Sequence, residues 1–548
     1  MQHEYTYDVS MFRDTFETRF TYLNGFLRNV SRFGTRPALH DPLSGRRWTY
    51  RELNAEANRL AHALRADGVG KNDVVMFALL NSPEFVFCYL AAHKIGAIAC
   101  PVNYRQGAGE IALVIDDSRP KAFFYDAEFG ELSGSALQLC EHKPQTVVMV
   151  DYKGGAAAPA GHKRYQDYVS MQPETDPPID FDPHIYDETT RLYTSGTTNR
   201  PKGVPINNVN EVLSAHDVMM HFPLGPLDRT MNMTPWFHRG GIHSGGPCPT
   251  LYAGGEVVIL RDFAPKRALE YAEKYQISFL IGVPTIIAML ARTQERTPAD
   301  LSALRGIVTM GAPFEKAACE KYMHLLTPNI FNGYGTTETF WNTFLRPFDL
   351  PEMAGSAGRS CTDDDVRLVA IHEDGTHAEP DETVPRDSET PGEIIISSPA
   401  KSAFCYYNNE EMTKAKFYKG WLYTGDVGTW DENEFVTVSG RKDDMIVSAG
   451  ENIYPTQIEA VLNEHPKVAE SAVIGVPDKL RGEVVAAYVV PSDNSLTVEE
   501  LKDYCTHHPM LSSYKWPREY HIVSELPHTA TGKLMHYKLR QQQKNREE

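Results

Sequence analysis

Hydrophobic and polar residues first follow a regular pattern after residue 48. Thr49 and Glu52 have the spacing of a capping box, in which each side chain satisfies an unpaired amide at a helix start. One face of the following segment is apolar and consists of Leu53, Ala57, Leu60, Ala61 and Leu64. Gly68 then ends the pattern, as glycine commonly does after a last helical turn. The pattern therefore predicts a helix with one face packed on a core.

The next segments alternate between strand and helix patterns. Residues 74–80 form an apolar run that is too short for a buried helix and fits a buried strand. Ser82 and Pro83 then start a second helix, and residues 97–102 form another strand-like run. Similar runs return at residues 255–260, 277–284 and 304–313. This alternation predicts a largely parallel sheet with helices on both faces.

The pattern changes after "GRKDD" at residues 440–444. Pro455 stands at the first turn of a predicted helix, and strands are predicted at residues 471–476 and 483–490. Thr497 and Glu500 have the capping spacing of a further helix. These elements predict an α+β unit of about 110 residues, small enough to move as one body.

The expected fold class is α/β with two domains, because 548 residues are too many for one core. Residues 1–440 are predicted to form a large N-terminal domain of parallel and mixed sheets with flanking helices. Residues 441–548 are predicted to form a small mobile α+β C-terminal domain. The acidic stretch between Glu373 and Glu393, which is rich in Thr and Pro, is interpreted as a solvated surface loop.

Composition narrows the classes of partner. The chain has 54 Lys and Arg against 72 Asp and Glu, a formal net charge of −18, which disfavours nucleic acid as the main partner. The eight cysteines lack the spacing of zinc ligands and are interpreted as buried thiols in a reducing cytosol. The N-terminus has no signal pattern, and the most apolar window, residues 84–102, contains His93 and Lys94. A cytoplasmic protein without a membrane span is therefore expected.

The stretch "RLYTSGTTNRPKGV", residues 191–204, has the composition of a phosphate-binding loop. Glycine lets backbone amides approach an anion, hydroxyls add rotatable donors, and Lys202 adds positive charge. A flexible linker is the alternative, and Pro201 argues against it. Lys202 has no glycine before it and no Ser or Thr after it, which excludes a P-loop.

Seven motifs then occur in an order that resembles the adenylate-forming superfamily of acyl-CoA synthetases, 4-coumarate-CoA ligases, luciferases and peptide-synthetase adenylation domains. They are "YTSGTTNRPKGV" at 193–204, "PWFHRGG" at 235–241, "MGAP" at 310–313, "NGYGTTE" at 332–338, "YTGD" at 423–426, "GRKDD" at 440–444 and "TGK" at 531–533. The resemblance covers nearly the whole chain. It implies an AMP-forming acyl-CoA synthetase that uses ATP, Mg²⁺ and coenzyme A.

The resemblance also implies a nucleotide site. Tyr334 would offer a flat face to adenine, Thr337 a hydroxyl to the α-phosphate, and Glu338 an oxygen ligand to Mg²⁺. Asp426 would accept hydrogen bonds from the ribose hydroxyls, and Arg441 would reinforce that contact. The expected nucleotide- and CoA-binding residues are Thr194, Ser195, Gly196, Thr197, Thr198, Lys202, Gly311, Ala312, Pro313, Asn332, Gly333, Tyr334, Gly335, Asp426, Arg441 and Gly450. Asn199 replaces a glycine that is usual in this loop and tolerates a left-handed backbone.

Catalysis is expected to involve Lys533, His238 and Thr337. The Lys533 cation would bridge the attacking carboxylate and the α-phosphate. Asp443 matches the hinge at which the small domain of the family changes orientation between the two half-reactions. The position of Pro527 before Lys533 resembles a site at which related synthetases are acetylated, so a lysine acetyltransferase is a possible partner.

The motifs constrain the identity of the carboxylic acid substrate less than they constrain the nucleotide site. His238 stands where aminoacyl-adenylating relatives carry Asp, which disfavours an α-amino acid and resembles a gate beside the acyl carboxylate. A metal role for nearby His243 is disfavoured, because no third ligand is evident. Bulky residues replace the small ones that are common around the acyl pocket, namely Trp236, Met310, Phe340 and Trp341. If they point inward, a short, branched or ring-bearing acid is favoured; the alternative is that they pack outward into the core.

Other functions stay open at this point. A medium-chain fatty acid–CoA ligase and an adenylating enzyme that loads a carrier protein are the main alternatives. A luciferase-like oxygenase and a nucleotide sensor are disfavoured, because no luciferin pocket is evident and the expected catalytic positions are filled. The physiological direction of the reaction and the oligomeric state are not predicted.

Overall fold

The structure is a computed structural model of the chain. It describes residues 4–194, 201–311, 314, 316–372, 374–448, 451–478, 482–493, 495–508, 511, 513–528 and 534–547. Ten residues named above lie outside these ranges: Ser195, Gly196, Thr197, Thr198, Asn199, Ala312, Pro313, Glu373, Gly450 and Lys533.

The backbone divides into two compact units. The first consists of Met1–Gly355, Ser360–Asp365 and Ser397–Gly420, and the second of Ser356–Arg359, Val366–Ile396 and Trp421–Glu548. The predicted domain boundary after residue 440 stays a prediction.

One sheet of the first unit has seven strands and the alternation that the sequence predicts. Its order is β7 (Lys163–Arg164), β6 (Thr146–Val150), β5 (Ala122–Asp126), β3 (Val74–Ala78), β4 (Ile98–Pro101), β8 (Glu188–Thr194) and β9 (Lys202–Asn207). All neighbours pair in parallel except β8 and β9, which form an antiparallel edge. The strand predicted over 74–80 ends at Ala78.

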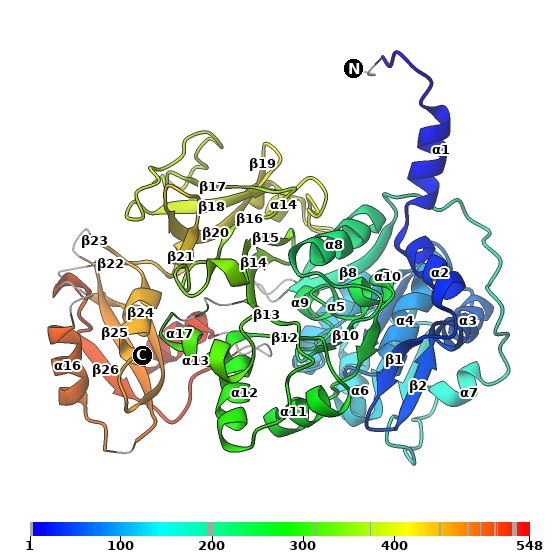
Figure 1. The fold of residues 1–548 in the computed structure, drawn as a ribbon, viewed down its shortest axis with the longest axis horizontal. Helices are drawn as coiled ribbons and strands as arrows, with labels where there is room; N and C mark the ends of the chain where they lie inside the picture. Colours follow the sequence, from blue (N-terminus) through cyan, green and yellow to red (C-terminus); the bar gives the residue numbers. More distant parts are fainter. Residues whose placement is uncertain are drawn as a thin grey trace. The chain divides into compact units, whose positions relative to one another are not determined.

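A second sheet of this unit carries the segments of most interest for function. It contains, in this order, β15 (Phe340–Leu345), β14 (Ile330–Thr336), β13 (Gly306–Met310), β12 (Phe279–Gly282), β10 (Arg229–Asn232), β11 (Glu256–Val258), β1 (Pro37–Asp41) and β2 (Arg46–Thr49) (Figure 1). Strands β10 to β14 are parallel to one another, and β15 turns back antiparallel to β14. Both sheets are therefore mixed, as predicted, because antiparallel pairs, β8–β9 and β14–β15, adjoin their parallel strands.

The first unit also contains α-helices, several of which pack on these sheets. They are α1 (Ser10–Arg19), α2 (Tyr22–Phe33), α3 (Tyr50–Ala66), α4 (Pro83–Lys94), α5 (Ala108–Ser118), α6 (Gly130–Leu139), α7 (Tyr165–Val169), α8 (Asn208–His221), α9 (Arg239–Ile242), α10 (Pro247–Ala253), α11 (Pro265–Lys274), α12 (Pro284–Arg296), α13 (Lys316–Leu325) and α14 (Glu410–Lys416). Short 3₁₀ turns occur at η1 (Ala127–Phe129) and η2 (Pro347–Asp349).

Local sequence signals account for several helix starts. The Thr49–Glu52 capping box is present at the start of α3, and the predicted apolar face of α3 is buried. Ser82 caps α4, where Pro83 occupies the first turn. Both helices therefore start where side chains satisfy otherwise unpaired amides.

The second unit contains two smaller sheets. Strands β17 (Asp365–Val369), β18 (Gly392–Ser397), β20 (Trp421–Trp430) and β21 (Val436–Arg441) belong to one. Strands β22 (Ile446–Ser448), β23 (Glu451–Ile453), β24 (Val468–Asp478), β25 (Gly482–Pro491) and β26 (Glu519–Ile522) form the other. Its helices are η3 (Lys442–Asp444), α15 (Pro455–Asn463), α16 (Val498–His507), η4 (Ser513–Lys515) and α17 (His536–Glu547). The short strands β16 (Arg359–Ser360) and β19 (Phe417–Tyr418) border segments that join the units.

The helices and strands predicted after residue 444 are confirmed, but the surface loop predicted before them needs a correction. Helix α15 starts at Pro455, Thr497 caps α16, and the two predicted strands lie within β24 and β25. The prediction of a solvated loop as far as Glu393 is wrong at its C-terminal end, because Glu393 lies in β18 and is only 4% exposed. Its carboxylate accepts the amide of Gly425 at 3.1 Å, which explains its burial.

Two further expectations bear on the class of protein. None of the helices in the described ranges is both long and apolar enough to cross a membrane. The cysteines are free thiols, and all but the half-buried Cys405 are buried.

Candidate active site

The phosphate-loop motif starts and ends on a paired hairpin. Thr194 is the last residue of β8 and pairs with Lys202, the first residue of β9. The next residue, Gly203, accepts the backbone N–H of Tyr407 at 2.8 Å, so a segment two hundred residues away supports the end of the hairpin. The predicted loop residues between these anchors lie outside the described residues.

The "NGYGTTE" motif forms a hairpin between β14 and β15. Gly335 pairs with Trp341 and Thr336 with Phe340, which leaves Thr337, Glu338 and Thr339 at the turn. A Cβ on Gly335 would lie 1.6 Å from the carbonyl oxygen of Phe340. Only glycine permits this approach of the two strands, so Gly335 shapes the turn whatever it binds.

Glu338, the predicted metal ligand, is held from two directions. Its backbone carbonyl accepts the N–H of Ala403 at 2.9 Å, and its Oε1 accepts the Tyr406 hydroxyl at 2.5 Å. The carboxylate is half-buried, and these contacts fix its direction. An oxygen donor fixed in this way fits a hard cation such as Mg²⁺.

His238 caps α9 with its backbone. Its carbonyl accepts the N–H groups of Gly241 and Ile242, and its side chain is half-buried, with the ring nitrogen Nε2 shielded from solvent. Burial, with a smaller contribution from Arg105, lowers the pKa of His238 to about 4. Nε2 has no hydrogen-bond partner among the described residues. A neutral imidazole with one free nitrogen is suited to a polar group of a bound ligand.

The next residue, Arg239, was missed by the sequence reasoning. Its Nη1 donates to the carbonyl of Thr337 at 2.5 Å, and its Nη2 donates to the carbonyl of Lys401 at 3.0 Å. A charged residue inside the apolar "PWFHRGG" motif was the available signal. The contact connects the His238 segment directly to the predicted phosphate-binding turn.

Three of the four predicted acyl-pocket residues lie together. Met310, Phe340 and Trp341 share one buried cluster, and the Phe340 and Trp341 rings stack with centroids 4.8 Å apart. Trp236 belongs to another cluster, where it packs edge-to-face on Phe85 at 5.5 Å. The structure therefore does not group Trp236 with the other three.

Two glycines mark where these bulky side chains approach the site motifs. A Cβ on Gly240 would lie 2.7 Å from the Met310 sulfur, and a Cβ on Gly333 would lie 3.0 Å from Trp341 Nε1. Met310 and Gly333 are neighbours in the sheet. The side chains of Met310 and Trp341 thus take up the space that Gly240 and Gly333 leave open.

Several buried polar atoms on β14 and β15 have no hydrogen-bond partner within the described ranges. They include Oδ1 of Asn332, a predicted nucleotide-binding residue, and the indole Nε1 of Trp341. Unsatisfied buried polar groups are rare in folded proteins and mark places where a ligand or water completes the hydrogen bonds. Gly311 directly follows β13, and Tyr334 lies on β14, two residues after Asn332.

The predicted ribose contact lies in the second unit. Asp426 on β20 pairs with Arg441 on β21, and Arg441 Nη1 donates to Asp426 Oδ1 at 2.7 Å. The predicted hinge residue, Asp443, lies close by in η3, which directly follows β21. Whether Gly450 and Lys533 join them is a prediction, since both lie outside the described residues.

His243 has a neighbouring carboxylate that was not evident from the sequence. Its Nε2 donates to Oε2 of buried Glu211 at 2.7 Å, and Cys248 Sγ lies 3.3 Å from the same oxygen. Glu211 also accepts the hydroxyls of Tyr89 and Thr190. Burial is the largest single influence and raises the pKa of Glu211, but His243, His93 and Thr190 together lower it overall. This network satisfies the carboxylate without any further ligand.

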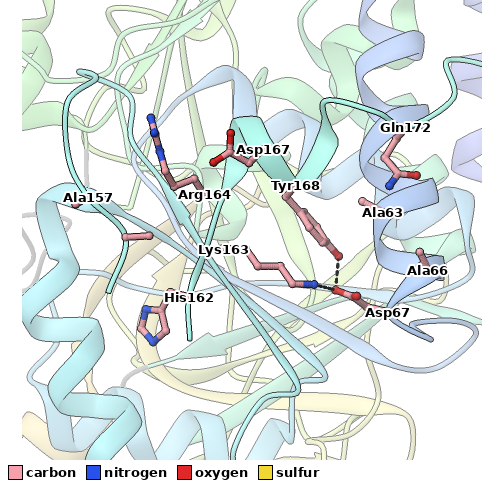
Figure 2. Close-up of a pocket in the computed structure, with 11 residues that line it drawn as sticks. Ala63, Ala66, Asp67, Ala157, His162, Lys163, Arg164, Asp167, Tyr168 and Gln172 are labelled. Carbon is pink, nitrogen blue, oxygen red and sulfur yellow. Dashed lines mark hydrogen bonds and ion pairs between the residues drawn. The ribbon is translucent and has the colours of Figure 1, made fainter. Parts of the chain in front are cut away.

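A surface pocket of about 670 Å³ lies elsewhere in the first unit (Figure 2). Figure 2 shows Asp67 at its wall, where it accepts Lys163 Nζ at 2.6 Å and the Tyr168 hydroxyl at 2.9 Å. None of the predicted site residues lines this pocket. This surface pocket is therefore not part of the candidate active site.

The order of the motifs, the two hairpins and the α+β fold of the C-terminal part fit an enzyme of the adenylate-forming class. Sequence comparison agrees with this class. The profile of the AMP-binding enzyme family matches residues 26–407, and that of the AMP-binding enzyme C-terminal domain matches residues 457–533. The chain belongs to this family.

Individual relatives are CoA ligases. The chain is 32% identical to an indoleacetate–CoA ligase of Aromatoleum aromaticum, over 90% of this chain and 92% of the relative. It is 30% identical to a long-chain-fatty-acid–CoA ligase of Mycobacterium tuberculosis, over 92% and 94%. The crystal structure of the anthranilate CoA ligase AuaEII with anthranoyl-AMP superimposes with a TM-score of 0.86 at 27% identity, covering 96% of this chain and 98% of that one. The protein is an AMP-forming carboxylate–CoA ligase, a class of enzyme that uses ATP and CoA.

Proposed function

We propose that this ligase activates a short, branched or ring-bearing carboxylic acid. The observation that carries the proposal is the position of Met310 and Trp341. Both are bulky and buried, and they fill the space that a Cβ on Gly240 or Gly333 would need, on the two motifs that flank the expected acyl site. Side chains of this size take volume that several methylenes of a long chain would need.

The first half-reaction is assigned to the turn after β14 and to the residues around it. A carboxylate oxygen attacks the α-phosphorus of ATP, and the bond to pyrophosphate breaks. Thr337 would donate its hydroxyl to the α-phosphate, and Glu338 would hold Mg²⁺, which neutralises charge on the phosphates. Lys533 would stabilise the charge that is redistributed in this step.

The remaining residues would orient the two substrates. Neutral His238 would face the acyl carboxylate with its free Nε2. Asp426, aligned by Arg441, would accept the ribose hydroxyls. In the second half-reaction the CoA sulfur attacks the acyl carbonyl carbon, the bond to the AMP oxygen breaks, and Gly450 would leave room for the thiol arm.

A panel of acids tests the substrate class. ATP–pyrophosphate exchange and thioester formation are measured with straight-chain acids from C2 to C12, branched acids, benzoate and cyclohexanecarboxylate. We expect kcat/KM to peak among short, branched or ring-bearing acids, and thioester to form with free CoA. A peak at C12 would instead favour a fatty acid–CoA ligase. Transfer of the acyl group only to a carrier protein would favour the carrier-loading alternative.

Variants sharpen this test. Met310→Ala should raise kcat/KM for the longer acids relative to the shorter ones by about tenfold, because each added methylene is worth roughly 1 kcal/mol or more in an apolar pocket. Phe348→Ala is the matched control, since Phe348 is 73% exposed and belongs to no predicted site. An unchanged chain-length profile in Met310→Ala would contradict the assignment of Met310 to the acyl site.

A further inference from the structure

Arg239 is a buried cation whose hydrogen bonds all go to neutral groups. It is 3% exposed, and its partners are the carbonyls of Thr337 and Lys401 and, at 3.4 Å, the Ser214 hydroxyl. No carboxylate of a described residue lies within 4.0 Å of it, and its Nε has no partner there. This arrangement is costly, because a buried charge is normally paired.

Other buried arginines of the first unit show the usual arrangement. Arg261 Nη2 lies 2.5 Å from Asp126 Oδ2, and Arg191 forms two hydrogen bonds with Glu188. Burial lowers the pKa of Arg239 to about 10, and the more distant carboxylates of Glu211 and Glu338 offset this only in part. Among the described residues, the positive charge of Arg239 is thus not neutralised by an ion pair with a neighbouring carboxylate.

The guanidinium connects the two segments that fix Glu338. Nη1 holds the carbonyl of Thr337, which is the peptide directly before Glu338. Nη2 holds the carbonyl of Lys401, two residues before the Ala403 amide that donates to the Glu338 carbonyl. The planar fork of arginine fixes both carbonyls at once, which a lysine does with less geometric control.

We propose that Arg239 is a positioning residue for adenylation, which fixes the Thr337–Glu338 turn and supplies positive charge beside the anionic reactants. The proposal rests on the roles proposed above for Thr337 and Glu338. Arg239 acts through the Thr337 carbonyl rather than by contact with ATP. A displaced turn would misplace the α-phosphate donor and the metal ligand together, and a misplacement of about 1 Å can cost roughly 10²-fold in rate.

The test uses the full-length enzyme with the best acid of the panel. Without CoA, rapid-quench measurement of pyrophosphate gives a burst amplitude, which counts competent sites, and a rate constant per site. For Arg239→Met we expect the rate constant to fall by about 10- to 100-fold with little change in amplitude. Arg239→Lys should recover part of this loss, because it keeps the charge.

Two comparisons separate positioning from a merely structural role. Ser214→Ala removes the weak third contact and leaves the Thr337 contact in place, so its rate constant should stay within about threefold of wild type. In a Thr337→Ala/Glu338→Gln background, which removes both functional side chains of the turn, Arg239→Met should lose most of its effect, since the turn then carries no group for Arg239 to position. Melting temperatures are recorded for every variant.

Three outcomes would overturn the proposal. A normal rate constant per site with a reduced burst amplitude would show that Arg239 only stabilises the fold. Additive effects of Arg239→Met and Thr337→Ala/Glu338→Gln would show that Arg239 does not act through the turn. Either result, obtained with an active wild-type enzyme, leaves the proposed function intact, whereas a wild-type enzyme inactive with every acid would overturn both.

Discussion

At the scale of single residues, His238 is a titratable group whose ring nitrogen Nε2 is shielded from solvent. Its pKa is lowered from 6.5 to about 4, chiefly by burial, so the imidazole is neutral at pH 7. Between these two values the unfolded chain binds a proton that the folded chain does not. The stability contributed by neutral His238 is therefore present above pH 6.5 and is lost as the pH falls towards 4.

This pH dependence is testable by urea unfolding at pH 7 and pH 5. His238→Gln should reduce the loss of unfolding free energy between these pH values by about 2 kcal/mol relative to wild type. His507→Gln is the control, because the His507 side chain is 74% exposed. Equal acid sensitivity of wild type and His238→Gln would contradict the lowered pKa.

The residues of the candidate site differ in how far sequence could predict them. Asp426 and Arg441 were predictable as a pair, because each lies in a motif, and they meet across neighbouring strands. The contact between Arg239 and Thr337 joins positions 98 residues apart, and neither its distance nor its lack of an acidic partner follows from a motif. Trp236 was grouped with Met310 by motif position alone, whereas packing separates them.

At the scale of secondary structure, the hairpin of β14 and β15 depends on one glycine. Gly335 was predicted to serve the nucleotide, yet a side chain there would meet the Phe340 carbonyl at 1.6 Å and the Trp341 Cα at 2.9 Å. Both atoms belong to the backbone, so neither can move aside without shifting the turn. The conformation that places Thr337 and Glu338 is therefore set by contact within the hairpin.

Gly335→Ala should accordingly lower the free energy of unfolding by about 1 to 3 kcal/mol, the usual cost of forcing extra atoms into a packed site. Urea denaturation measures this change, and the adenylation rate should fall as well. Gly109→Ala is the matched control: Gly109 lies in helix α5 with nothing within 4 Å of its added Cβ, so alanine there should be neutral or slightly stabilising. Equal stability of the two variants would contradict a steric role for Gly335.

Elements were more predictable than their arrangement. Capping residues and apolar runs are local, so helices α3, α4, α15 and α16 start as expected. The order of strands in a sheet depends on contacts that are distant in sequence, and the antiparallel return of β15 on β14 has no signal in the hydrophobic pattern. The burial of Glu393 was missed for the same reason, since its partners Gly425 and Lys442 come much later in the chain.

At the scale of the whole molecule, the predicted hinge falls inside one compact unit. Asp443 lies in η3, between the β17–β18–β20–β21 sheet and the β22–β26 sheet, both assigned to the second unit. Contacts bridge this point, because the Thr456 hydroxyl donates to the carbonyl of Ser439. A rotation about Asp443 must break that contact, so the hinge hypothesis requires the second unit to divide during the catalytic cycle.

Asp443→Pro tests this requirement, since proline fixes φ and removes an amide donor. If one residue's backbone rotation exchanges two orientations of the C-terminal part, the variant should keep one half-reaction and lose the other by about tenfold or more. ATP–pyrophosphate exchange measures the first, and conversion of a supplied acyl-adenylate with CoA measures the second. Asp443→Ala is the control, because it leaves φ free, and Lys533→Ala provides the reference pattern of selective loss in the first step. Normal rates of both steps in Asp443→Pro would place the moving joint elsewhere, for which the segments that join the two units are the alternative.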